Sequence, residues 1–184
     1  MKKKALLITS IILALSVSAQ TNSWVRKEIG NGLSVSFPTA PTYNLNELGS
    51  TYTAQNSNCV FMVMITHNVI AKDYDKFVLA ESKWTENEKR TIAYAFLDNF
   101  VKGRIDSAGG KNVTSSNVKV GGFYGKKLEY SAVNILNGEV GKRFGIALAL
   151  LKYNKVISFE CWYLNNSTAS ESDKNLFFNS IKKQ

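Results

Sequence analysis

One stretch in the C-terminal half decides the fold: Phe144-Gly145-Ile146-Ala147-Leu148-Ala149-Leu150. Large apolar residues alternate here with glycine and alanine. This alternation is the period of a β-strand, whose successive side chains point to opposite faces of a sheet. One face carries bulk, and the other is small enough for a helix to approach closely. The stretch therefore predicts a sheet that lies between helical layers.

Further strands surround this one in the C-terminal half. The apolar pattern predicts strands over residues 113–120, 124–133, 140–153 and 156–164. Gly121-Gly122 and Asn137-Gly138 lie between them and are turn signals, the second one typical of a β-hairpin. These strands are expected to form an antiparallel meander.

The N-terminal half also contains strands. Leu33, Val35 and Phe37 alternate with serines, and the Asn31-Gly32 turn before them predicts a hairpin with residues 24–29. Prolines 38 and 41 end that strand, because proline cannot donate to a strand ladder. A strand is expected over 50–55, and the unbroken apolar run 60–65 predicts a central strand covered on both faces.

Residues 73–105 have a helical period. Thr85 and Glu88 form a capping-box pattern, which predicts two helices that meet at Trp84 and Thr85. Aromatic residues recur at helical spacing, and we expect them to be core residues rather than a ligand site: Tyr74, Phe77, Trp84, Phe96 and Phe100.

A last helix is expected to close the chain. Its predicted caps are Ser170 and Asp173. The inward-facing residues are expected to be Phe177, Phe178 and Ile181, with Lys182 and Lys183 at the helix end, where positive charge is favourable. The fold class is therefore α+β: an antiparallel sheet of about six to seven strands flanked by helices, in a single domain over residues 20–184.

The first 19 residues have the three parts of a secretory signal peptide: Lys2 to Lys4, an apolar run over 5–17, and Val17-Ser18-Ala19 as a cleavage site. The run is shorter than the ~20 residues of a spanning helix. We therefore expect export to the periplasm or the exterior and cleavage after Ala19, the alternative being an uncleaved anchor. The nearest cysteine is Cys59, so the acylated cysteine of a lipoprotein is missing at this point.

Cleavage would also change the charge. It would remove three lysines from a chain of 184 residues and net charge +9, leaving 165 residues at +6. That value is ordinary for a soluble domain and only weakly suggests an anionic partner. A turn at Asn137-Gly138 would place Lys142 opposite Val133 and Lys127 opposite Leu148, so the basic pairs Lys126-Lys127 and Lys142-Arg143 would lie ~17 Å apart. No single basic patch and no nucleic acid partner are expected.

The residues of catalytic and metal chemistry are scarce. His67 is the only histidine, and no Gly-x-Ser-x-Gly motif is present. One histidine and two cysteines cannot build the usual zinc cages. We assign no catalytic, cofactor-binding or metal residues and expect no cofactor. Cys59 and Cys161 are either a disulfide, as export favours, or two separate buried thiols.

A family resemblance rests on two quoted segments, Leu33-Ser34-Val35-Ser36-Phe37-Pro38-Thr39-Ala40-Pro41 and Phe177-Phe178-Asn179-Ser180-Ile181, and on the order of elements between them. In these the chain resembles the PsbP-like and DcrB-like proteins. The resemblance implies an α/β/α sandwich in envelope or lumenal proteins that act as accessory or binding modules. It brings no shared catalytic constellation with it, so it bears on fold more than on function.

These observations favour an exported, monomeric, non-enzymatic binding or accessory protein of the bacterial envelope. Its partner would be another envelope protein or a small ligand, with no transmembrane segment after cleavage. Two alternatives stay open: an exported hydrolase, and a surface protein that binds anionic polysaccharide or lipid.

Overall fold

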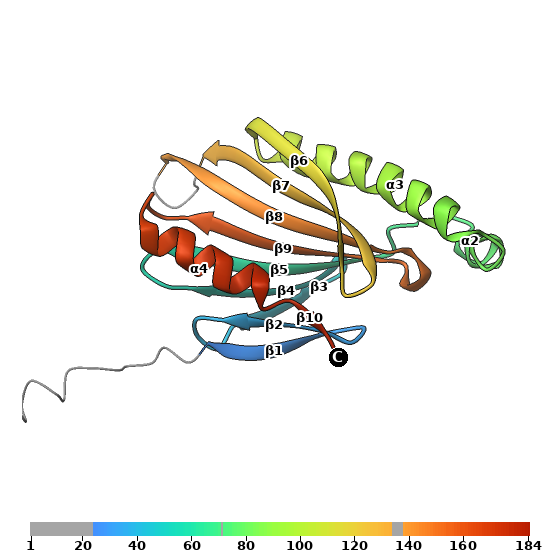
Figure 1. Cartoon of the computed structure of the whole chain (residues 1–184), viewed down its shortest axis with the longest axis horizontal. Coiled ribbons are helices and arrows are strands. Elements are labelled where there is room, and N and C mark those ends of the chain that lie inside the picture. The colour runs from blue at the N-terminus through green and yellow to red at the C-terminus, as the bar shows by residue number, and fades with distance from the viewer. Residues whose placement is uncertain (1–23, 71, 134–137) are drawn as a thin grey trace, which may run out of the picture.

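The computed structural model describes residues 24–70, 72–133 and 138–184 (Figure 1). The predicted signal peptide and Asn137 of the predicted hairpin turn lie outside these residues. The strands of the main sheet are β3 (Thr42–Asn46), β4 (Gly49–Gln55), β5 (Cys59–His67), β6 (Lys111–Val120), β7 (Phe123–Val133), β8 (Val140–Leu150) and β9 (Lys155–Tyr163). They pair antiparallel in the order β3-β4-β5-β9-β8-β7-β6.

The alternation in β8 has the predicted consequence. Phe144, Leu148 and Leu150 join a core on one face of the sheet, whereas Ala147 and Ala149 join a second core on the other face. Two of the helices cover the faces of the sheet: α3 (Glu86–Ser107) lies on the alanine side and α4 (Thr168–Asn179) on the bulky side. The short helix α2 (Tyr74–Glu81) lies beyond the end of the sheet, next to the start of α3 (Figure 1). The predicted α+β fold class is confirmed.

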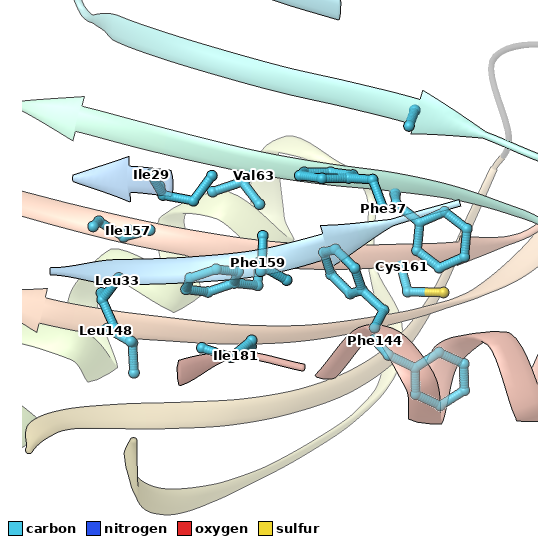
Figure 2. Close-up of a cluster of buried hydrophobic side chains, with 14 of the residues drawn as sticks. Ile29, Leu33, Phe37, Val63, Phe144, Leu148, Ile157, Phe159, Cys161 and Ile181 are labelled. Atoms are coloured by element: carbon cyan, nitrogen blue, oxygen red, sulfur yellow. The ribbon is translucent and has the colours of Figure 1, made fainter. Parts of the chain in front are cut away.

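A second, three-stranded sheet shares the bulky side with α4. It consists of β1 (Val25–Gly30), β2 (Leu33–Phe37) and β10 (Lys182–Lys183), in the order β1-β2-β10. The predicted hairpin at Asn31-Gly32 is confirmed, and both turn residues have positive φ angles, 54° and 73°. Figure 2 shows residues of this small sheet, such as Leu33 and Phe37, in one cluster with main-sheet residues, such as Phe159.

The helix start in the middle of the chain follows the capping-box prediction. The backbone N–H of Glu88 donates to Thr85 Oγ1 at 3.3 Å, and the N–H of Thr85 donates to Glu88 Oε2 at 2.7 Å. From there α3 buries one residue per turn: Ala93, Leu97, Val101 and Ile105. This row packs on residues of β7 and on the alanines of β8, which places α3 over the sheet.

The predicted caps of the last helix were wrong. The N-cap of α4 is Ser167, whose hydroxyl accepts from the backbone N–H of Ser170 at 3.1 Å. Ser170 lies buried in the first turn. Asp173 instead accepts hydrogen bonds from the side chains of Asn56 and Asn58 at 2.9 and 2.8 Å, and so ties α4 to the turn before β5.

The positions of Lys182 and Lys183 also differ from the prediction. The helix ends at Asn179, and burial of Ile181 draws the next residues into an extended path. Lys182 and Lys183 therefore pair with Ser34 and Leu33 as β10 rather than ending the helix.

Two strand predictions needed correction. The exposed edge strand β3 was not predicted, because all five of its residues face solvent and its apolar pattern is weak. The strand expected over 140–153 ends at Leu150, where the 3₁₀ helix η2 (Leu151–Tyr153) turns the chain toward β9. Among the helices of the described residues, none has both the length and the apolar character needed to cross a bilayer.

Candidate functional site

A cavity of about 300 Å³ lies where α2 and α3 meet the end of the main sheet. Its lining comes from three distant segments: the α2–α3 region, the turn from β6 into β7, and the turn after β8. The aromatic members of the lining are Phe77, Trp84, Phe123, Tyr124 and Tyr153. The aromatic side chains share the lining with the charged residues Glu81, Glu86, Lys89 and Lys152, so apolar and polar groups converge on one concave space, as they do in small-ligand sites.

Two alanines explain why the space is unfilled. Ala93 of α3 and Ala149 of β8 both line the cavity, and both are buried. Neither side chain extends beyond Cβ, so the helix and the strand leave room between them. The helix therefore packs on β7 and β8, and the small side chains Ala93 and Ala149 leave a cavity near its N-terminal end.

Aromatic contacts fix the walls. The rings of Phe77 and Trp84 meet edge to face, with centroids 5.3 Å apart. On the opposite wall, the ring of Tyr124 contacts Tyr94 at 5.6 Å, and its hydroxyl donates to Glu86 Oε2 at 3.1 Å. The hydroxyl of Tyr74 donates to the carbonyl of Lys152 at 2.5 Å and joins α2 to η2.

A short chain of charges lies at one side of the cavity. Lys89 Nζ is 3.6 Å from Glu81 Oε1 and 3.7 Å from Glu86 Oε1. Both distances exceed that of a hydrogen bond, so the ammonium is shared between two carboxylates rather than fixed to one. Lys152, on η2, adds an exposed positive charge to the lining.

The aromatic residues predicted as core have two different outcomes. Phe96 and Phe100 pack against the core under α3, as expected. Phe77 and Trp84 instead line the cavity, and α2 buries none of its side chains, Tyr74 included. Helical spacing shows that residues share a face, but it does not show whether that face meets a packed sheet or a cavity.

His67 lies at the end of β5, opposite Lys155, and does not line the cavity. The constellation that would favour a hydrolase, a pocket that joins His67 to an acid and a hydroxyl, is not found at this cavity in the described part of the chain. Within the described ranges, no group of three or more histidine, cysteine or acidic side chains could hold a metal ion.

Cys59 and Cys161 are neighbours on the α4 face of the sheet. The register places Cys59 opposite Tyr163 and Cys161 opposite Phe61, so the two cysteines are diagonal to each other. Both are buried free thiols in the structure. A hydrogen bond with Cys59 and burial raise the pKa of Cys161 far above its usual value, which keeps that thiol protonated and unreactive. A disulfide between the two cysteines stays a prediction, and counting free thiols in denaturant decides it.

The two basic pairs lie in a different register from the predicted one. Val133 pairs with Val140, so Lys142 lies opposite Ser131, and Lys127 opposite Ile146. The prediction was two residues out because it assumed that the chain turns tightly at Asn137-Gly138.

The basic residues are also engaged individually. Lys126 is ion-paired with Asp98. Arg143 is buried and stacks on the ring of Trp162 at 4.1 Å, while its guanidinium donates to the carbonyl of Val133 at 2.7 Å. Half of the basic residues that suggested an anion site are therefore used within the fold.

The sequence did not predict the buried carboxylate of Glu160. Glu160 is 5% exposed and accepts hydrogen bonds from Arg104 at 2.7 Å and from the indole of Trp162 at 2.9 Å. Its position between Phe159 and Cys161 in an apolar strand was the available signal, because an acid in a buried strand needs a partner. The paired carboxylate anchors α3 to β9.

Comparisons with known proteins give distant structural similarity and no family. No family model matches the chain, and no curated protein matches it. The Ran-binding protein Mog1p of Saccharomyces cerevisiae is similar over 84% of this chain and 86% of its own, with 11% identity and a TM-score of 0.43. A protein of unknown function from Pseudomonas aeruginosa, PA94, is similar over 81% of this chain and 86% of its own, with 9% identity and a TM-score of 0.40.

Proposed function

We propose that this chain is an exported, non-enzymatic binding module that holds a small ligand in the cavity between α2, α3 and the sheet. One observation carries the proposal: five aromatic side chains from three distant segments meet around a space of about 300 Å³. Aromatic surface that is left unpacked at a cavity lowers the free energy of an apolar ligand that fills it.

The chemistry of the lining supports binding rather than catalysis. Its ionisable groups are those of Glu81, Glu86, Lys89, Lys152 and two tyrosines. Lys89 lies between the two carboxylates, and the Tyr124 hydroxyl is bonded to Glu86. No histidine, cysteine or serine of the described residues lines the space, so the common nucleophiles and the commonest general base are absent from that lining.

Export and the family resemblance complete the proposal. The signal-peptide pattern of residues 1–19 supports a place outside the cytoplasm. The PsbP-like and DcrB-like resemblance supports an accessory role in the envelope. Intact-mass measurement of the exported protein tests the first point: we expect the mass of residues 20–184, and the mass of the whole chain would contradict cleavage.

The binding function is tested with phenylnaphthylamine, a neutral aromatic dye that fluoresces when it leaves water. The full mature chain should bind it saturably at one site, with energy transfer from Trp84, which lines the cavity. The Phe77→Ala variant should bind about tenfold more weakly, because it removes one aromatic wall.

The matched control is Leu79→Ala. Leu79 lies on the same helix, is 69% exposed and does not line the cavity. Its removal should leave dye affinity unchanged. Dye uptake that does not saturate, or equal affinities for the Phe77 and Leu79 variants, would overturn the proposal.

A further inference from the structure

Three lysines surround the aromatic cavity without a partner carboxylate. Lys152 is on η2, Lys119 is near the end of β6, and Lys183 is in β10. All three are exposed, and none forms an ion pair within the described residues. An exposed ammonium with no carboxylate beside it attracts an anion.

Two of these lysines, Lys119 and Lys183, contact the rings of residues that line the cavity, although neither lysine belongs to the lining itself. Lys119 Nζ lies 4.8 Å from the ring centroid of Tyr124, and Lys183 Nζ lies 5.0 Å from that of Phe123. Both rings belong to residues that line the cavity. The cation–π contacts keep the two ammonium groups close to the cavity.

Backbone pairing and a close turn also fix the position of Lys183. Its backbone pairs with Leu33, and the Gly121-Gly122 turn passes directly against it. A side chain at Gly121 would approach Lys183 Cβ to 3.1 Å, so the glycine permits this close passage. The C-terminal strand is thereby locked beside the β6–β7 turn that forms part of the cavity.

The balance of charge around the cavity is positive. Glu81 and Glu86 supply two negative charges, whereas Lys89, Lys152, Lys119 and Lys183 supply four positive ones. Lys89 already lies between the two carboxylates. The surplus of positive charge therefore belongs to the rim lysines Lys119, Lys152 and Lys183.

We infer, building on the proposed function, that the ligand of this cavity is a small aromatic acid. Its planar apolar body packs among the aromatic walls, and its carboxylate or sulfonate group faces the rim lysines. The size of the cavity suits a small molecule of this class, since ligand sites begin at about 300 Å³.

Two dyes of the same scaffold test this inference. Anilinonaphthalene sulfonate carries an anionic group, and phenylnaphthylamine lacks it. The mature chain should bind the sulfonate more tightly than the neutral dye. Added salt should weaken binding of the sulfonate only, because it screens exposed charges.

A triple variant removes the rim charges: Lys119→Gln, Lys152→Gln and Lys183→Gln. It should bind the sulfonate about tenfold more weakly and the neutral dye within about twofold of the original chain, since exposed charges each contribute modestly. The control is Lys111→Gln, Lys127→Gln and Lys142→Gln, which makes the same charge change at exposed lysines that do not line the cavity. The control should bind both dyes as the original chain does.

The outcomes separate this inference from the proposed function. If both dyes bind the original chain equally, or the rim and control variants lose equal affinity for the sulfonate, the aromatic-acid inference fails and the cavity remains a binding site. If neither dye binds the original chain, the proposed function fails and this inference fails with it.

Discussion

The two short helices α2, beyond the end of the main sheet, and α4, on one of its faces, are held by different contacts (Figure 1). The eight-residue α2 starts at Asp73, which has φ 58° and makes no side-chain cap bond, and it buries no side chain. The twelve-residue α4 starts at a side-chain cap on Ser167 and buries Ser170 and Phe177. Both helices carry two aromatic residues, yet only α4 packs into a core. The difference indicates that α4 stabilises the fold, whereas α2 forms one wall of the cavity.

The largest expected effect is a difference in the free energy of unfolding between variants of Phe177, in α4, and Phe77, in α2. Phe177 is fully buried, with ring contacts to Phe37 at 5.6 Å and Phe61 at 5.1 Å. Phe177→Ala should lower the free energy of unfolding by about 3–5 kcal/mol. Phe77→Ala should lower it by about 1 kcal/mol or less, because α2 buries no side chain. Urea unfolding of both variants measures this, and equal losses would break the comparison.

Two Asp→Asn substitutions, at Asp173 and at Asp73, test the polar contacts that hold α4 and α2. Asp173→Asn replaces a carboxylate that accepts from two asparagines with an amide, and should cost about 1–2 kcal/mol in urea unfolding. Asp73→Asn should change stability by less than about 0.5 kcal/mol, since asparagine also tolerates a positive φ and the Asp73 carboxylate is ion-paired with the exposed Lys76. A larger loss at Asp73 than at Asp173 would reverse the assignment of roles.

The smallest expected effect is a pH dependence of stability, which comes from Glu171 in α4. A hydrogen bond from Lys174, and a second from the hydroxyl of Tyr163, lower the pKa of Glu171 from 4.5 to about 2. Because the pKa of Glu171 is lower in the folded chain than in the unfolded chain, its ionised carboxylate stabilises the fold above pH 4.5. This contribution is lost as the pH falls from 4.5 to about 2. Because Glu171 is exposed, we expect the loss to be about 0.5 kcal/mol or less.

Glu171→Gln is the control for this effect. The difference in stability between the original chain and this variant should be constant above about pH 5 and shrink below it. A difference that does not change over that range would show that Glu171 makes no pH-dependent contribution.

Much of the fold could be predicted because its signals are local. The large and small residues of β8 indicated two covered faces, and Thr85 with Glu88 fixed a helix start to the residue. The sequence predictions were wrong where several neighbouring residues could take the same structural role, or where a turn could have several lengths. Near α4, three hydroxyl residues stand close together, and Ser167 rather than Ser170 became the cap. The two-residue error between β7 and β8 arose because a turn signal does not state the length of its loop.

The cavity could not be predicted from local pattern. Phe77, Phe123 and Tyr153 meet only after the sheet has brought three segments together. The rim depends on Lys183 in particular, and its position follows from β10, a strand of two residues with no sequence period of its own. The tertiary fold, rather than any motif, creates this site.

The pairing of β10 with β2 has a consequence for the order of folding. Lys183 pairs with Leu33 across 150 positions of the chain, and β5 pairs with β9 across as many as 104. Closing such long loops costs entropy before the strands stabilise one another, so folding is slow. The β1–β2 hairpin can form early, but the main sheet cannot be completed before β9 has been synthesised, and the small sheet cannot be completed before β10. The growing chain therefore stays incompletely folded until β10 has been synthesised.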